Sequence, residues 1–308
     1  MPQARVASAP PSASQAHLGM LLWAVLVGLS FPAVRLVSEA LPPLSLTALR
    51  FVIASLALWG LARRAPDWWP SGRSLLLYAL MGLCLAGFFS AMFWAAHHAT
   101  ALSMATLFVS VPLLAYCLGL GARVERLAWR LPSILALGAA GALGLAWAES
   151  RGNTAGLRFG VGEAVFFLGC VSSALYPVLS KWGLAHRWLS PSAAARTFWS
   201  LAIGAVLIGS LGLMFEPVGR LARMTARDAL LLVYLGLFSS AMTFWLLQRA
   251  TAVLTPGAVT AYNYLVPFVS MLLLFIRQPG QIGWAWLPGC VLVLTAIALL
   301  LRRDRPHT

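Results

Sequence analysis

Residues 18–38 read LGMLLWAVLVGLSFPAVRLVS, an apolar run that contains a single charged side chain, Arg35. About 20 mostly apolar residues in a helix cross the roughly 30 Å hydrocarbon core of a bilayer. Amphipathic periodicity is weak in this run, as expected for a helix surrounded by other helices and by lipid. The stretch therefore predicts a transmembrane helix, and similar runs recur along the chain.

The composition of the whole chain agrees with this prediction. Hydrophobic residues make up 60% of the 308 residues and charged residues only 10%, against about 25% charged residues in ordinary soluble proteins. Too few charges remain to cover a water-facing surface. The sequence predicts an all-α integral membrane protein in the cell (inner) membrane, with the lipid bilayer as its surroundings. Its ten expected spans are 18–38, 45–62, 74–95, 101–120, 131–148, 161–180, 193–215, 229–247, 257–276 and 283–301.

The charge pattern indicates which side of the membrane each loop occupies. The net charge is +14, but the basic residues are scattered between apolar runs and form no basic patch, so a nucleic-acid partner is not expected. With the N-terminus in the cytoplasm, thirteen Lys and Arg fall inside and six outside. The positive-inside rule then predicts that both termini are cytoplasmic. Residues 1–17 are expected to form a disordered tail, and residues 302–308 a second cytoplasmic tail.

Two halves of the sequence resemble each other. Residues 90–94 read SAMFW and residues 240–245 read SAMTFW, and prolines pair in the same order along both halves. This predicts a first five-helix repeat over 18–148, a linker over 149–160 and a second repeat over 161–301. Because five is odd, the second repeat must enter the membrane from the opposite side. Inverted repeats of this kind recur in transporters, where they permit alternating access to a central site.

Several short motifs resemble one known family. They are Phe31-Pro32-Ala33-Val34-Arg35, Leu41-Pro42-Pro43-Leu44 and Ala48-Leu49-Arg50-Phe51 in the first half, and Gly162-Glu163, Tyr176-Pro177 and Val266-Pro267 in the second. Together with two repeats and ten spans, they resemble the EamA type of the drug/metabolite transporter superfamily. That resemblance implies export of amino acids and other metabolites without a covalent cofactor. The family often has an acidic residue after the fourth helix of each half; Glu125 occupies that place in the first half, and Gly280 or Gln281 in the second.

Four prolines lie within the predicted spans, and each is expected to kink its helix around a shared space or, alternatively, toward lipid. They are Pro32, Pro112, Pro177 and Pro267. Polar and aromatic side chains inside the spans are the candidate substrate-binding residues, with packing or interfacial roles as the alternative. They are Trp23, Phe31, Arg50, Trp94, Tyr176, Arg196, Trp245, Tyr262, Asn263 and Tyr264. Arg50 and Arg196 would attract substrate carboxylates, or would reach the lipid headgroups instead.

No carboxylate lies at the centre of a predicted span. Because proton-coupled pumps commonly use such a group, we expect exchange or gradient-driven facilitation, or else an unusual proton site. Glu163 is the nearest candidate for coupling, with an interfacial anchor as the alternative. The four cysteines fall inside apolar runs without metal-ligand spacing, so neither a metal nor a cofactor is expected.

The sequence thus favours a secondary transporter that exports small organic metabolites, amino acids or related compounds and drugs among them, by alternating access. A membrane-embedded enzyme is the first alternative, but the chain carries no HExxH or GxSxG motif and its three aspartates lie in loops. A non-transporting membrane scaffold is the second, and it would not need two similar halves. The oligomeric state is left open, a homodimer included.

Overall fold

The computed structural model describes residues 11–65, 67–150, 160–277 and 283–303, and every regular element in these ranges is helical. The first half contains α1 (Ala13–Leu36), α2 (Pro43–Ala62), α3 (Gly72–Ala95), α4 (Ala101–Phe108), α5 (Val111–Gly121) and α6 (Arg130–Glu149). The second half contains α7 (Val161–Ala185), α8 (Ala193–Phe215), the 3-10 helix η2 (Val218–Arg223), α9 (Ala226–Tyr234), the π-helix η3 (Leu235–Met242), α10 (Thr243–Thr251), α11 (Pro256–Thr260), the 3-10 helix η4 (Ala261–Tyr264), α12 (Leu265–Arg277), the 3-10 helix η6 (Trp284–Trp286) and α13 (Leu287–Arg303).

Nine helical segments in the described ranges are long and apolar enough to cross a membrane. They correspond to nine of the ten predicted spans, and the prediction of an all-α membrane protein is confirmed. The remaining run, predicted over 257–276, is not one helix, because it is divided into α11, η4 and α12.

The first helix begins earlier than its hydrophobic run. Ser12 caps the N-terminus of α1, its hydroxyl accepting a hydrogen bond from the backbone N–H of Gln15, whose side chain accepts one from the backbone N–H of Ser12. This capping box satisfies backbone donors that would otherwise lack partners. The predicted tail boundary at residue 17 is therefore too late; residues 1–10 lie outside the described part of the chain, as do most of the predicted linker and residues 304–308.

The fourth helix of each half is broken near its proline. In the first half α4 ends at Phe108 and α5 starts at Val111, which places Pro112 in the first turn of α5. In the second half the chain passes through η4 before α12, and Pro267 stands in the first turn of that helix. Proline is tolerated there because the first N–H groups of a helix have no partner within it. Pro112 and Pro267 thus follow a break instead of kinking a continuous helix, whereas Pro32 and Pro177 lie inside α1 and α7.

Corresponding helices of the two halves run antiparallel where they meet. A Cβ placed on Gly141 of α6 would lie 2.7 Å from the backbone nitrogen of Val293 in α13, and one placed on Gly144 would lie 3.4 Å from Cα of Gly289. Helices α2 and α8 pair in the same manner, since Gly212 faces Ser45 and Gly204 faces Phe51. Small residues at such crossings let two backbones approach closely. Antiparallel pairing of equivalent helices is what an inverted second repeat requires.

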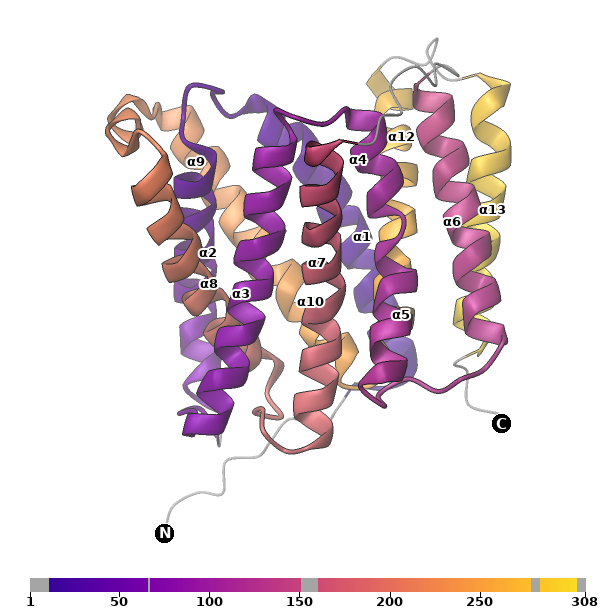
Figure 1. Cartoon of the computed structure of the whole chain (residues 1–308), viewed down its shortest axis with the longest axis horizontal. Helices are drawn as coiled ribbons and strands as arrows, with labels where there is room; N and C mark the ends of the chain where they lie inside the picture. Colours follow the sequence, from indigo (N-terminus) through magenta and orange to yellow (C-terminus); the bar gives the residue numbers. More distant parts are fainter. Residues whose placement is uncertain (1–10, 66, 151–159, 278–282, 304–308) are drawn as a thin grey trace.

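The connections define two ends of the bundle (Figure 1). We call the end where α1 begins and α13 ends the terminal end, and the end where α6 ends and α7 begins the linker end. Helices α6 and α13 stand together at one side of the bundle, and α2 and α8 at the other.

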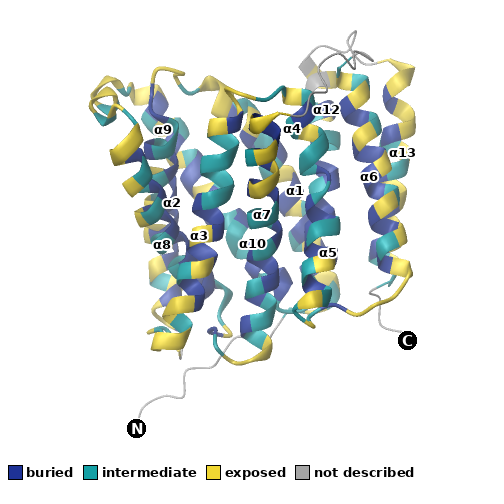
Figure 2. Ribbon diagram, viewed as in Figure 1, coloured by how far each residue is buried: buried dark blue, intermediate teal, exposed yellow. Residues whose placement is uncertain are grey.

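Buried residues line the inside of the bundle and exposed ones its outside and ends (Figure 2). The outward positions carry large apolar side chains, such as Leu168 and Val206, which are 65% and 67% exposed. In water such a surface would be an aggregation hazard, but against acyl chains it is the expected surface of a spanning helix.

Candidate functional site

A buried arginine marks the contact between the two halves. Arg50 of α2 is 8% exposed, and its Nη2 donates to the hydroxyls of Ser239 and Ser240 in η3, each at 3.2 Å. Its guanidinium carbon lies 6.0 Å from the centre of the Phe89 ring of α3. Its Nε is buried without a hydrogen-bond partner, and no carboxylate in the described ranges pairs with it. A desolvated, incompletely satisfied cation is costly and therefore points to function.

The π-helix brings the two serines to this arginine. Wide π turns are rare, appear mostly as interruptions of α-helices and are frequent at functional sites. The Thr243 hydroxyl donates to the backbone carbonyl oxygens of Ser239 at 2.7 Å and Ser240 at 3.2 Å, which helps satisfy carbonyls in the irregular turn. Gly236 allows close approach of η3 to α2, since a Cβ there would lie 2.7 Å from Cγ2 of Ile53.

The sequence carries a signal for the π-helix that periodicity does not reveal. Comparing SAMFW at 90–94 with SAMTFW at 240–245 shows one extra residue, Thr243, in the second copy. The equivalent first-half helix, α3, is a continuous α-helix. One residue inserted into an α-helix turns everything after it by about 100° unless a wider turn absorbs it. The π-helix immediately before Thr243 is such a turn, and it keeps the flanking helices in register.

The second predicted arginine has a different environment. Arg196 is fully buried, and its donors are engaged by three acceptors: Nε by Oε1 of Gln248 at 2.9 Å, Nη1 by the Ser190 carbonyl at 2.7 Å and Nη2 by the Gln248 carbonyl at 2.6 Å. Ser180 donates to the same Gln248 Oε1 at 2.6 Å. This network joins α7, α8 and α10 within the second half. Its geometry favours a structural role for Arg196 over substrate contact.

A line of aromatic rings leads from Arg50 into the second half. Ring centres of Phe51 and Phe89 are 5.3 Å apart, those of Phe51 and Phe244 6.1 Å, and those of Phe244 and Tyr176 5.8 Å. The Tyr176 hydroxyl lies 2.9 Å from that of Ser200. The structure therefore brings Tyr176 into the same cluster as Arg50. Phe89 and Phe244 are further members that were not among the predicted site residues. Trp245 packs against this cluster too.

The other aromatic candidates lie elsewhere. Trp23, Tyr262 and Tyr264 are buried in a separate core formed with α6 and α13. The Tyr262 hydroxyl is 2.7 Å from Nδ1 of His17, and a Cβ on Gly138 would overlap the Tyr264 ring. Asn263 between them is half-buried.

Two candidates face outward. Phe31 is 51% exposed and Trp94 is 41% exposed, the latter stacked on His98 with ring centres 4.0 Å apart. Neither side chain is brought toward Arg50, and both positions suit contact with lipid or with the interface.

The candidate coupling residue, Glu163, caps a helix. Its side chain is 3% exposed, and its Oε2 accepts a hydrogen bond from the backbone N–H of Gly160 at the start of α7. A carboxylate near a helix N-terminus is stabilised by the helix dipole and by the free N–H groups. The geometry explains the residue without proton transfer, and a coupling role stays a prediction.

Carboxylates also connect the halves at both ends of the bundle. At the linker end, Glu216 accepts hydrogen bonds from the backbone N–H groups of Leu44 at 2.7 Å and Ser45 at 2.9 Å. At the terminal end, Glu125 is 7% exposed and accepts one from the backbone N–H of Gly257 at 3.1 Å. Burial raises the pKa of the Glu125 carboxyl above its ordinary value, against the opposing effect of that hydrogen bond. The position of Glu125 is evident in the sequence, but these contacts are not.

No cluster of three or more His, Cys, Asp or Glu side chains that could hold a metal occurs in the described ranges. What the structure brings together is a cation, two hydroxyls and aromatic rings between two antiparallel halves. Such an arrangement can bind an anionic organic group.

Comparison with known proteins assigns the class and then the family. The profile of the EamA-like transporter family matches twice, over residues 14–147 and 160–302, and so covers both halves. The protein is accordingly a multi-pass membrane transporter and not an enzyme. The chain belongs to the EamA-like transporter family.

Relatives named as transporters agree with this assignment, and a solved structure shares the fold. The chain is 27% identical to the uncharacterized inner membrane transporter YedA of Escherichia coli strain K12, over 81% of this chain and 78% of that protein. It is 23% identical to the uncharacterized transporter YcxC of Bacillus subtilis strain 168, over 92% and 91%. A crystal structure with 22% identity superposes with a TM-score of 0.74, over 96% of this chain and 100% of the other, and shows the shared fold.

Proposed function

We propose that this transporter is a secondary exporter of small organic metabolites that carry a carboxylate, such as amino acids or related compounds. The observation that carries the proposal is Arg50, a buried cation held by two hydroxyls and lacking a carboxylate partner in the described ranges. A substrate carboxylate would supply the missing charge and accept from the free Nε–H. Paired hydrogen bonds between guanidinium and carboxylate are among the strongest that proteins make.

The surroundings of Arg50 suit an organic anion better than an inorganic one. Phe89 and Phe51 provide an apolar wall beside the guanidinium, and Phe244 and Tyr176 extend it. An aromatic or aliphatic substrate side chain would pack on these rings while its carboxylate faces Arg50.

The location supports alternating access. Arg50 belongs to the first half and its serine partners to the second, so relative movement of the halves changes this contact directly. Glu216 and Glu125 hold the halves together near opposite ends, and either could release while the other stays closed. Export is the direction implied by the family resemblance, and the charge distribution favours cytoplasmic termini in the inner membrane.

Transport would proceed by exchange or by facilitation along the substrate gradient. No carboxylate approaches Arg50 in the described ranges, and the nearest candidate for proton coupling, Glu163, already caps α7. A strict dependence on a pH gradient that disappears in Glu163→Gln would replace this mechanism with proton coupling.

The experiment is uptake of a labelled amino-acid panel by proteoliposomes. It compares the wild-type protein with Arg50→Gln and Arg50→Lys, and with Arg35→Gln, an exposed arginine at the end of α1, as the control. Since hydrogen bonds to charged groups contribute about 1.5–3 kcal/mol, Arg50→Gln should weaken uptake of carboxylate solutes about tenfold or more. Arg50→Lys should retain part of it, and Arg35→Gln should match wild type. Wild-type vesicles that move no solute would favour a scaffold, and unchanged uptake by Arg50→Gln would refute this site.

A further inference from the structure

A second basic site lies away from Arg50, at the terminal end between α6 and α13. A pocket of about 480 Å³ is lined there by Trp129, Arg130, Ser133, Ile134, Leu299, Arg302 and Arg303. This volume lies within the roughly 300–1,000 Å³ range of small-molecule sites. Three of the seven lining residues are arginines and none is acidic.

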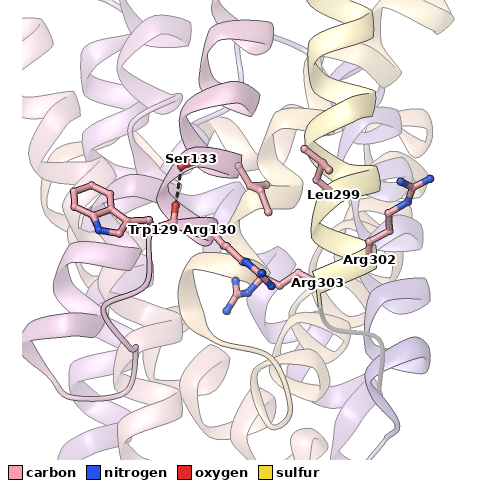
Figure 3. Close-up of a pocket in the computed structure, with 7 residues that line it drawn as sticks. Trp129, Arg130, Ser133, Leu299, Arg302 and Arg303 are labelled. Atoms are coloured by element: carbon pink, nitrogen blue, oxygen red, sulfur yellow. Dashed lines mark hydrogen bonds between the residues drawn. The ribbon is translucent and has the colours of Figure 1, made fainter. Parts of the chain in front are cut away.

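Two of the arginines converge inside the pocket (Figure 3). Arg130 at the start of α6 and Arg303 at the end of α13 extend their guanidinium groups toward each other, while Arg302 points away. Two guanidinium groups directed into one pocket give it a positive potential, which favours an anionic ligand. The charge of Arg303 acts on the nearby Glu125 carboxylate, which accepts a hydrogen bond from the Gly257 N–H and does not line the pocket.

The local backbone adds to the positive potential. Helix α6 is 20 residues long and starts at Arg130, and its N-cap residue, Trp129, provides no side-chain hydrogen bond to the first turn. The Ser133 hydroxyl donates to the Trp129 carbonyl. The positive end of a helix dipole with uncapped N–H groups favours phosphate and other anions.

The remaining walls are apolar and interfacial. The apolar lining comes from Ile134 of α6 and Leu299 of α13. Trp129, at the start of α6, is 87% exposed. Tryptophan is enriched where a bilayer meets water. The pocket therefore combines a cationic end at the level of the headgroups with apolar walls that extend toward the acyl chains.

We propose that this pocket binds a phosphate-bearing anion, and specifically the phosphodiester headgroup of an anionic membrane lipid. Basic pockets between transmembrane helices are a known mode of anionic lipid recognition. The site is separate from the transport site, and because it joins the fifth helices of both halves, a bound lipid would stabilise the α6–α13 contact.

The test measures lipid binding to the purified full-length protein. Native mass spectrometry and thermal unfolding are recorded in mixed micelles containing phosphatidylglycerol, phosphatidylcholine or, in a third arm, inorganic phosphate with phosphatidylcholine. The variant is Arg130→Gln/Arg303→Gln. The control is Arg63→Gln/Arg126→Gln, which removes two charges at the same end of the bundle but outside the pocket.

Wild type and control should retain phosphatidylglycerol in preference to phosphatidylcholine and unfold at higher temperature with it. The pocket variant should bind it about tenfold or more weakly. If inorganic phosphate stabilised the wild-type protein as much as phosphatidylglycerol does, and Arg130→Gln/Arg303→Gln abolished that effect, the pocket would still be a phosphate site, but its ligand would be a soluble anion. A second pair, Arg130→Lys/Arg303→Lys, retains charge and should lose less binding, which covers poor folding of the first variant. Undiminished lipid preference in either pocket variant, or an equal loss in the control, would overturn the proposal.

Discussion

The two buried arginines should respond in opposite ways when each is replaced by methionine, an apolar side chain of similar length. Arg50→Met removes a desolvated charge, an unpartnered Nε–H and two hydrogen bonds of 3.2 Å to serine hydroxyls. The serines retain access to local backbone acceptors, as such hydroxyls do in helices. Desolvation of a buried ion costs several kcal/mol, and two hydrogen bonds to a charged group return roughly 3–6 kcal/mol. The free energy of unfolding should therefore change by no more than about 1 kcal/mol, or increase.

Arg196→Met should be severely destabilising by the same reasoning. It removes hydrogen bonds of 2.9, 2.7 and 2.6 Å and leaves two backbone carbonyls and the Gln248 amide oxygen with fewer donors in a fully buried setting. Breaking a buried network in this way costs about 3–5 kcal/mol.

The assay is denaturant and thermal unfolding of the purified variants without substrate, combined with proteoliposome uptake. Arg50→Met should fold as stably as wild type and fail to transport, whereas Arg196→Met should fold poorly. Loss of function without loss of stability is expected where a protein maintains a costly group for its ligand. If Arg50→Met were destabilised as much as Arg196→Met, Arg50 would be a structural residue and the reasoning would be refuted.

Three further predictions test the local arguments. Deletion of Thr243 should convert η3 to a regular α-helix, which moves Ser239 and Ser240 away from Arg50 and lowers transport about tenfold or more while the yield of folded protein is kept. The control is deletion of Met92 at the equivalent place in the continuous helix α3, which should prevent folding. Equal yields of folded protein from the two deletions would contradict the insertion of Thr243 into a shared helix pattern. Glu125→Gln should be more stable than wild type at pH 7, because burial raises the folded-state pKa of the Glu125 carboxyl above its ordinary value of 4.5. Wild-type stability therefore decreases as pH rises from 4.5 through the folded-state pKa, and the difference between the two proteins shrinks as pH falls toward 4.5; a difference in the free energy of unfolding that stays constant across pH would argue against this. Gly141→Ala should lower the free energy of unfolding by about 1–3 kcal/mol, because its Cβ would lie 2.7 Å from the Val293 backbone nitrogen. The control, Gly60→Ala, has open space around it and should be neutral or slightly stabilising in the same unfolding assay. Equal effects of the two substitutions would contradict close α6–α13 packing.

The sequence was sufficient for most of the fold because membrane insertion depends on a simple physical quantity. A run such as 193–215 has only apolar or small residues around Arg196, and the predicted span and α8 coincide. The run over 257–276 was predicted as one helix, since hydropathy does not distinguish a continuous helix from short turns buried among other helices. The Pro256 and Pro267 positions are compatible with either outcome.

The site was predictable only in part because partners come from distant segments. Arg50 and Arg196 occupy similar places in the two repeats and are indistinguishable by type. Their roles separate only when Ser239 and Ser240 stand beside the first and Gln248 beside the second. The extra residue Thr243 was visible as an insertion, but its consequence required the backbone to show a π-helix.

The most direct measurement is the accessibility of a cysteine placed at Ser239, beside Arg50, in a chain whose four native cysteines are replaced. Sealed vesicles of known orientation are treated with a membrane-impermeant thiol reagent from either side, with and without a transported solute. The account predicts that Ser239→Cys reacts from both sides, and that the solute protects it and shifts the balance between them. Reaction from one side only, unaffected by any transported solute, would contradict a substrate site between two alternating halves.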